Sequence, residues 1–321
     1  MTNSGDLTPP QGGQLPEVGE APADPRVEWG LPAFGALPVT SELTETLVRV
    51  IAPNASHMTL DGTNTYVVGE RGSGAAFVID PGPDDRAHLA RVRSALAGLD
   101  AECCGIVVTH HHLDHSEAAR SWGAALGARV AAATKEVAGP DGKLLSDGDA
   151  LSAGGVTLTA VPTPGHCADH LCFRLPDGGL LSGDHILGRG TSVVAWPEGD
   201  LAAYLSSLRR VLDLGPDALF PGHGPELTED PGAVISYYLD HRAWREERVL
   251  AAVEEEADLA SRPADLVAKI YADVDPVLWP AAELSTRACL VKLAAEGKVS
   301  GLPLDPPGTN GRGGNSGHPV G

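Results

Sequence analysis

The sequence predicts an α+β protein in which two β-sheets pack as a sandwich and a smaller helical module follows. Before residue 231, short β-branched runs alternate with turns rich in Gly, Pro and Asp. Several of these runs follow one another without an intervening helix, which favours two packed sheets over one doubly wound sheet. After Pro231 the apolar residues recur at helical spacing instead, which predicts a change of architecture at this point.

The predicted elements follow from these runs in chain order. Strands are expected at 65–68, 76–79, 106–109, 129–132, 156–161, 170–174 and 179–182, and one more before the turn at 221–224. Helices are expected at 86–97, 116–125 and 201–212, then at 234–257, 263–271 and 278–296, with a short extension at 298–302. Three helices with a small hairpin fit a winged-helix module, and a plain helical cap on the first domain is the alternative interpretation.

Two predicted domains lie between two predicted tails. Eighteen of the 43 residues in 1–25 and 304–321 are Gly or Pro. Such segments bury too little apolar surface to offset the entropy cost of ordering their backbone. We therefore expect disordered tails at 1–25 and 304–321, a sandwich domain at 26–231 and a winged-helix-like domain at 232–303.

Charge and composition narrow the function classes. The chain has 23 Lys or Arg against 43 Asp or Glu, a formal net charge of −20, which repels polyanions at long range. The first residues lack the basic and apolar regions of a secretory signal. The sequence also has no run of 18 apolar residues, so we predict no membrane-spanning helix. Five cysteines make no disulfide framework in 321 residues. We expect a cytoplasmic protein without a membrane partner, and a homo-oligomer stays open.

The most informative segment is Val107-Val-Thr-His-His-His-Leu-Asp-His115. An apolar strand ends here and a helix is expected to begin at residue 116. His110 and His112 are two residues apart, so in an extended segment they project to one side, and Asp114 and His115 follow at the turn. Neutral imidazoles with a carboxylate are usual ligands of a divalent ion such as zinc. A His-rich surface tract is the alternative interpretation.

Three later turns repeat this context, each directly after a predicted strand. They are Val161-Pro-Thr-Pro-Gly-His166, Leu180-Leu-Ser-Gly-Asp184 and Leu219-Phe-Pro-Gly-His223. A single His or Asp in such a turn is usually an ordinary loop residue. Four strand-end turns that each present a metal-ligand side chain together predict a metal site.

This pattern resembles that of the metallo-β-lactamase superfamily, in which His-x-His-x-Asp-His precedes a single His, a single Asp and a final His. The resemblance implies a four-layer αβ/βα sandwich with a two-metal site at one edge of the sheets. It assigns one metal to His110, His112 and His166, the second metal to Asp114, His115 and His223, and the bridge between them to Asp184. His111 matches the variable position and is not assigned as a ligand.

Two further segments and the helical module narrow the resemblance. Met58-Thr-Leu-Asp-Gly-Thr-Asn-Thr-Tyr66 and Gly183-Asp-His-Ile-Leu-Gly188 are similar to the β-lactamase-like protein 2 group. That group joins the hydrolase domain to a small winged helix. The similarity covers roughly residues 39–302, which is most of the chain between the predicted tails.

The resemblance implies metal-assisted hydrolysis. Two divalent ions about 3.5–4 Å apart share a water, lower its pKa to about 7 and so form the attacking hydroxide. Asp114 is the expected catalytic residue, which orients this hydroxide and moves its proton, and no organic cofactor is expected. Zinc is the expected metal, with Mn²⁺ and Fe²⁺ as alternatives because nitrogen and oxygen ligands suit all three. Asn64, His170 and His185 are expected to support turns, packing or ligands rather than to react.

A small-molecule ester, thioester or lactone is the favoured substrate. The alternative is single-stranded RNA, because an endonuclease activity is associated with the β-lactamase-like protein 2 group. Residues 233–303 contain 8 Lys or Arg against 12 Asp or Glu. Such a balance offers little counterion release from phosphates, so it favours the small molecule.

Overall fold

The structure, a computed structural model, describes residues 18–272 and 274–300. These residues group into two compact units: a larger one of 19–194 and 198–245, and a smaller one that contains 195–197, 246–272 and 274–300. Helix α6 (Pro231–Glu255) belongs to both units, and the domain boundary that we place at residue 231 stays a prediction. Most of the first predicted tail (1–17) and all of the second (304–321) lie outside the described residues. Within the described part of the chain, every helix is too short or too polar to cross a bilayer.

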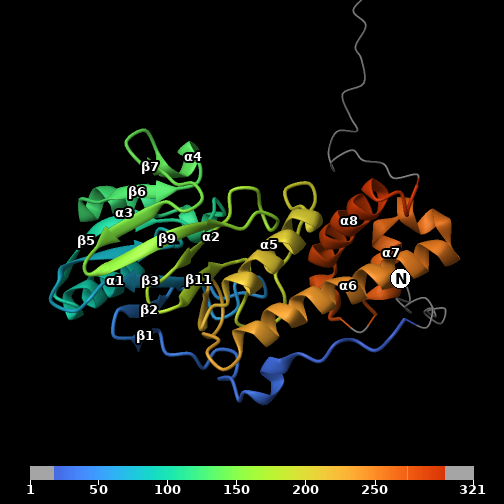
Figure 1. Cartoon of the computed structure of the whole chain (residues 1–321), viewed down its shortest axis with the longest axis horizontal. Helices are drawn as coiled ribbons and strands as arrows, with labels where there is room; N and C mark the ends of the chain where they lie inside the picture. Colours follow the sequence, from blue (N-terminus) through green and yellow to red (C-terminus); the bar gives the residue numbers. More distant parts are fainter. Residues whose placement is uncertain (1–17, 273, 301–321) are drawn as a thin grey trace, which may run out of the picture. The chain divides into compact units, whose positions relative to one another are not determined.

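The first sheet of the larger unit has seven strands in chain order (Figure 1). Neighbours run antiparallel from β1 to β4 and parallel from β4 to β7. The strands are β1 (Thr40–Thr44), β2 (Leu47–Ile51), β3 (Asn64–Val68), β4 (Gly74–Ile79), β5 (Ala101–Val107), β6 (Arg129–Ala132) and β7 (Lys143–Leu144). Every residue of β2 and β3 is buried, because both faces of this sheet are covered.

The second sheet has five strands in the order β12-β11-β10-β9-β8. They are β8 (Ala150–Ala153), β9 (Val156–Pro162), β10 (Leu171–Arg174), β11 (Gly179–Gly183) and β12 (Ala218–Pro221). β11 and β12 are parallel and the other pairs are antiparallel. It follows that β9, β11 and β12 all run in the same direction and end at the same edge.

Helices cover the outer face of each sheet, which completes the predicted four-layer αβ/βα sandwich. On the first sheet lie α1 (Arg86–Gly98), α3 (Ala119–Leu126) and the short α4 (Lys135–Ala138). On the second, Ser207 of α5 (Leu201–Leu214) donates a hydrogen bond to Pro164 O just after β9. The Asp85 and Asp200 side chains cap α1 and α5 by accepting from the backbone N–H three residues on.

Two apolar cores hold these layers together. One lies between the first sheet and its helices and contains Val92, Leu96 and Trp122. The other lies between the two sheets and contains Phe173 and Phe220. Each large side chain buried in this way stabilises the fold by roughly 1.5–3 kcal/mol. The packed sheets therefore hold their strand ends in fixed relative positions.

The smaller unit is helical. Beyond the end of α6 it contains η2 (Ala257–Ser261), α7 (Pro263–Ile270), η3 (Pro276–Leu278) and α8 (Trp279–Ala295). Leu266, Ile270 and Leu293 are fully buried in it, and Trp196 N donates to Leu284 O at 3.2 Å. Residues 246–272 and 274–300 contain no strand, so the predicted small hairpin is not found there. Residues 301–302 of the predicted extension lie outside the described part.

Six of the seven strand ranges predicted from the sequence are found with small shifts at their ends, and β12 is found before its turn. The predicted strand at 106–109 is wrong at its start, because β5 begins at Ala101 and ends at Val107. The predicted helix at 116–125 is wrong at its start, because α2 (Leu113–Ser116) precedes α3 and contains Asp114 and His115. Strands β1, β2, β7 and β8 were not predicted. β2 was missed because Arg49 interrupts its apolar run; this arginine is buried and forms an ion pair with Glu226. β7 and β8 were missed because they are exposed edge strands without a clear apolar pattern.

Residues 18–25 of the predicted first tail are described by the structure and lead into η1 (Pro25–Glu28). Arg26 is 4% exposed, and its guanidinium donates to Leu187 O at 2.9 Å and to Gly190 O at 2.7 Å. Asp24 pairs with the same guanidinium at 2.7 Å. The buried Arg26 thus attaches residues 18–25 to the segment that contains Leu187 and Gly190, although the composition of residues 1–25 predicts a disordered tail.

His88 of α1 is a buried histidine with a neutral ring. The Thr65 hydroxyl donates to Asp80 O at 2.7 Å and therefore accepts from His88 Nε2 at 2.8 Å. Burial, with a smaller contribution from the Arg91 charge, lowers the pKa of His88 to about 4. Acid therefore favours the unfolded state, in which the same ring titrates near its ordinary value of 6.5.

We expect His88→Gln to reduce the pH dependence of stability. Because the folded pKa lies below the unfolded one, the wild type loses about 2 kcal/mol at this residue between pH 7 and pH 5. Urea denaturation of both proteins at the two pH values measures the difference, and the comparison cancels the histidines that both proteins share. Equal losses of unfolding free energy in the two proteins would contradict this assignment.

Candidate metal centre

The predicted ligands lie at one edge of the two sheets, because the strands that precede them end there. β4 and β5 are parallel, and β9, β11 and β12 share one direction. Two backbone hydrogen bonds join the sheets at this edge, from Leu171 N to Thr109 O and from Asn64 N to Gly222 O, each of 2.8 Å. The loops after β5, β9, β11 and β12 contain His110, His112, Asp114, His115, His166, Asp184 and His223.

Three imidazoles form the first group of ligand atoms. Nδ1 of His112 lies 3.0 Å from Nε2 of His110 and 3.0 Å from Nε2 of His166. His110 and His166 are buried, whereas the side chain of His112 is 29% exposed. Three ring nitrogens this close together can coordinate one ion.

A second group adjoins the first through Asp184. Nε2 of His223 lies 3.2 Å from Nε2 of His115 and 3.3 Å from Oδ2 of Asp114. Oδ1 of Asp184 lies 3.3 Å from Nε2 of His115 and 3.4 Å from Nε2 of His223. Oδ2 of Asp184 lies 3.9 Å from Nε2 of His166, in the first group. The seven side chains therefore form one cluster with the Asp184 carboxylate between its halves.

Each of the five rings also has its outer nitrogen held by an oxygen atom. The pairs are His110 Nδ1 with Thr109 Oγ1 (2.9 Å), His112 Nε2 with Glu198 Oε1 (3.0 Å), His115 Nδ1 with Asp80 Oδ2 (2.9 Å), His166 Nδ1 with Val193 O (2.6 Å) and His223 Nδ1 with Gly62 O (3.2 Å). Carboxylate and carbonyl oxygens only accept, and the Thr109 hydroxyl gives its proton to Asp80. The outer nitrogen therefore carries the hydrogen in every ring, and the inner nitrogen of a neutral ring presents a lone pair.

These inner lone pairs and the two carboxylates repel one another unless a proton or a cation lies among them. Burial lowers the pKa of His110 and His166, so these rings stay neutral. Burial also disfavours the charged form of His223, but Asp184 and Asp114 outweigh it and raise its pKa to about 9. Burial opposes the charged form of His115 too, and Asp184 with Asp80 raises its pKa well above the ordinary value. The second group therefore favours positive charge at the inner nitrogens of His115 and His223.

This donor set fits a divalent metal ion. Oδ1 of Asp184 is buried and accepts no hydrogen bond from the described residues. Nitrogen and oxygen donors of this kind suit zinc, manganese and iron. Ligating imidazoles usually give their other N–H to a carboxylate or a carbonyl, and here four of the five rings do so.

Asp80 and Glu198 belong to the site but were not predicted. Asp80 follows β4, and its carboxylate accepts from Thr109 N at 2.7 Å, from Thr109 Oγ1 at 2.8 Å and from His115. The turn Val78-Ile79-Asp80-Pro-Gly has the same strand-end form as the four predicted turns, so that signal was present. Glu198 follows no strand and matches no motif, so nothing in the sequence indicated that it belongs to the site.

Three supporting residues can now be placed. The Asn64 amide donates to Pro221 O at 2.9 Å and to Gly224 O at 2.8 Å, so it fastens the His223 loop. His170 Nε2 accepts from Asp184 N at 3.0 Å, which orients the backbone of that residue. His185 is fully buried, with its ring centre 5.0 Å from that of Tyr204.

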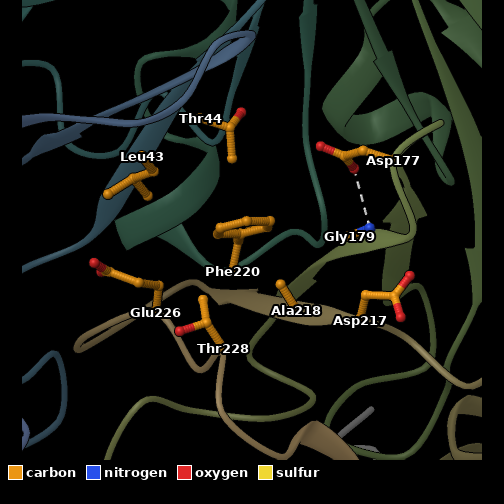
Figure 2. A pocket seen from close by; sticks show the side chains of 9 residues that line it. All are labelled: Leu43, Thr44, Asp177, Gly179, Asp217, Ala218, Phe220, Glu226 and Thr228. Atoms are coloured by element: carbon orange, nitrogen blue, oxygen red, sulfur yellow. Dashed lines mark hydrogen bonds between the residues drawn. The ribbon is translucent and has the colours of Figure 1, made fainter.

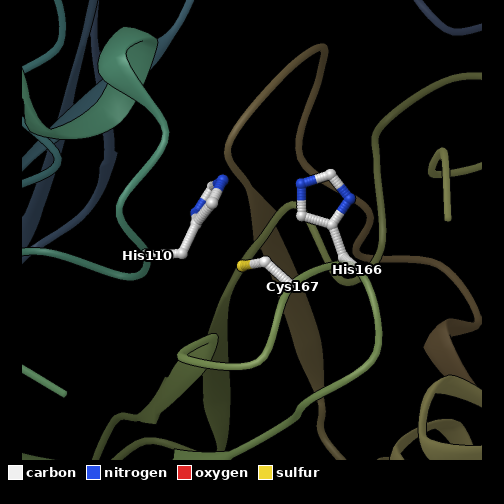
Figure 3. A group of neighbouring side chains, drawn as sticks. All are labelled: His110, His166 and Cys167. Atoms are coloured by element: carbon white, nitrogen blue, oxygen red, sulfur yellow. The ribbon is translucent and has the colours of Figure 1, made fainter. Parts of the chain in front are cut away.

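Cys167 lies beside the first group of imidazoles, on the same turn as His166. Figure 3 shows its thiol pointing toward His110. Burial, together with the charge of Asp169, raises the pKa of this thiol. Since the thiolate is the form that binds metals, the thiol is a weaker candidate ligand than the neutral imidazoles around it.

A separate cavity of about 310 Å³ lies at the other end of β11 (Figure 2). Three carboxylates line it, those of Asp177, Asp217 and Glu226, together with Phe220. Gly179 begins β11 and lines this cavity, whereas Asp184 follows the end of β11. Five residues of strand span about 16 Å, so the cavity is not part of the metal centre.

Comparison with known families agrees with this fold. Residues 58–223 match the model of the metallo-beta-lactamase superfamily, and residues 263–302 match that of the beta-lactamase associated winged helix domain. The chain therefore belongs to the metallo-beta-lactamase superfamily and has the associated winged helix domain. The superfamily is generally hydrolytic and binds divalent metals, which agrees with the His and Asp groups described above.

The chain is also similar to individual proteins of known sequence or structure. A beta-lactamase-like protein 2 homolog of Drosophila melanogaster is 34% identical over 82% of this chain and 92% of its own length. The lactamase-like protein adaB of Aspergillus niger is 34% identical over 68% of this chain and 67% of its own length. A crystal structure of a metallo-beta-lactamase family protein from Thermus thermophilus aligns with TM-score 0.66 at 24% identity, over 80% of this chain and 95% of that one.

We expect Asp80→Asn to weaken metal binding about 10- to 100-fold, as replacement of such an orienting partner usually does. The amide nitrogen donates instead of accepting, so it cannot serve both Thr109 and His115. Competition with a chromophoric chelator measures the affinity. Asp177→Asn, in the cavity of Figure 2, is the matched control and should bind metal as the wild type does.

We also expect Asp184→Ala to lose at least one metal equivalent, because this carboxylate lies between both groups of ligand atoms. Elemental analysis of the purified protein after metal loading and gel filtration measures the content. Full occupancy in the variant would show that the assignment of Asp184 is wrong.

Proposed function

We propose that this protein is a binuclear metal-dependent hydrolase that cleaves ester, thioester or lactone bonds in a small molecule. One observation carries the proposal: five imidazoles have their outer nitrogens fixed, so their inner nitrogens face each other and two carboxylates. One ion would be held by His110, His112 and His166, the second by Asp114, His115 and His223, with Asp184 contacting both. Two divalent ions, zinc first among the candidates, would activate water at neutral pH and stabilise charge on the substrate oxygen.

Asp114 is the residue that we assign to proton transfer. Its side chain is 31% exposed, whereas that of Asp184 is 12% exposed, so Asp114 is the more accessible of the two carboxylates. Burial disfavours its ionised form, but the hydrogen bond with His223 and the neighbouring charge of His115 outweigh this and lower its pKa. Asp114 is therefore an ionised carboxylate that can accept a proton from the attacking water and return it to the leaving group.

The surroundings of the site favour an uncharged, partly apolar substrate. Leu113, between His112 and Asp114, is 71% exposed and suits an apolar acyl group. The carboxylates of Asp169 and Glu198 each lie 2.7 Å from a nitrogen of His111, the residue that precedes His112. The same Glu198 oxygen lies 3.0 Å from Nε2 of His112, and carboxylates beside a predicted ligand repel a phosphate backbone, which disfavours the RNA alternative.

We expect the metal-loaded wild type to hydrolyse members of a panel of thioesters, esters and lactones and to leave a fluorogenic single-stranded RNA intact. Asp114→Asn should lower kcat on the order of 10²–10⁴-fold, because the amide cannot accept the proton. Steady-state kinetics on both proteins measure the effect, with metal content determined in parallel.

Two controls keep this test sharp. Asp177→Asn removes a carboxylate from the distant cavity of Figure 2 and should retain wild-type kinetics. If the RNA is cleaved and Asp114→Asn abolishes that cleavage, the protein is a nuclease and the substrate proposed here is wrong.

A further inference from the structure

Three side chains outside the predicted ligand set form a chain of contacts that ends on His112. Nδ1 of His111 lies 2.7 Å from Oδ1 of Asp169, and Nε2 of His111 lies 2.7 Å from Oε1 of Glu198. The same Glu198 oxygen lies 3.0 Å from Nε2 of His112. Asp169 comes from the loop after β9 and Glu198 from the segment before α5, so residues distant in sequence meet at this point.

We propose that Glu198 is a positioning residue for His112, and that His111 and Asp169 hold Glu198 in place. The inference deepens the proposed function, since it rests on His112 serving as a ligand of the first group. Glu198 accepts the outer N–H of His112 and thereby directs Nδ1 toward His110 and His166. His111, at the variable position of the motif, acquires a role that the motif itself does not assign.

His112 needs such a partner more than the more deeply buried rings do. Its side chain is 29% exposed, whereas those of His115, His166 and His223 are 0%, 10% and 1% exposed. Packing therefore fixes the buried rings, and it leaves His112 free to turn on its exposed side. A rotated ring would present Nε2 inward and remove Nδ1 from the first group.

Glu198 in turn needs a second contact. Its side chain is 42% exposed, and a glutamate held in one geometry loses rotamer entropy. His111 contacts Glu198 on one side and Asp169 on the other, and the Asp169 side chain is 9% exposed. The buried end of this chain of contacts thus anchors the exposed end.

The first test uses the metal-free full-length protein. Long-range ¹H–¹⁵N correlation spectra above the ordinary imidazole pKa report which nitrogen of each ring carries the hydrogen, and His112→Asn identifies the His112 signals. The wild type should show His112 protonated at Nε2. Glu198→Ala should show a mixture of tautomers, and Glu198→Gln should restore the Nε2–H form because the amide oxygen still accepts.

The second test measures metal affinity by competition with a chromophoric chelator. Glu198→Ala should weaken the first-group metal about 10- to 100-fold, with a smaller loss in His111→Ala and most of the affinity kept in Glu198→Gln. Glu42→Gln is the matched control. Glu42 lies on β1 and forms an exposed ion pair with Arg71, so the variant should bind metal as the wild type does. Circular dichroism and Tm confirm that each variant is folded.

The outcomes separate this inference from the proposed function. A folded Glu198→Ala protein with the wild-type tautomer and wild-type affinity overturns the positioning role, whatever substrate is turned over. Metal binding that depends on Glu198, in a protein that cleaves RNA instead of thioesters, supports the positioning role and overturns the substrate. If the wild type binds no metal, the tautomer of the metal-free protein still decides the role of Glu198.

Discussion

The structure depends on holding five imidazole lone pairs and two carboxylates against one another at the shared edge of two sheets. Neighbouring ligand atoms lie 3.0 to 3.9 Å apart, and in a buried setting such groups raise the free energy of the fold unless a cation lies among them. A metal that binds the folded state and not the unfolded state stabilises the folded state by mass action. If these atoms bind a metal as we propose, folding and metal binding are coupled through them, and the two apolar cores supply the stability that keeps the edge aligned.

The oxygen atoms that accept the outer N–H groups of the rings come from different parts of the fold. Val193 O and Gly62 O are backbone atoms, Asp80 is the first residue after β4, and Thr109 is the residue before His110. Asp80 joins two of these elements, because it accepts from both Thr109 and His115. A change in any of these loops therefore reaches the metal ligands through one hydrogen bond.

The position of this cluster could be predicted from the sequence, because its predicted ligands follow strand ends and strand ends leave a clear pattern. Apolar runs closed by Gly or Pro located the loops of His166, Asp184 and His223. The rest could not be predicted, for reasons that are local. β2 was missed because a buried Arg49 breaks its apolar pattern and its partner Glu226 is 177 residues away. Glu198 was missed because its role exists only through a contact across 86 residues.

The carboxylates that orient the ligands also set the electrostatic potential that a substrate meets. Glu198 orients His112 and, with Asp169, places negative charge beside the reacting atoms, in a chain whose net charge is already −20. Cations are drawn to such a site and phosphates are repelled from it. Two bound divalent ions would offset part of this charge at the centre of the cluster, whereas the surrounding carboxylates would remain. The substrate that we propose has a neutral carbonyl and would meet less of that barrier than a polyanion would.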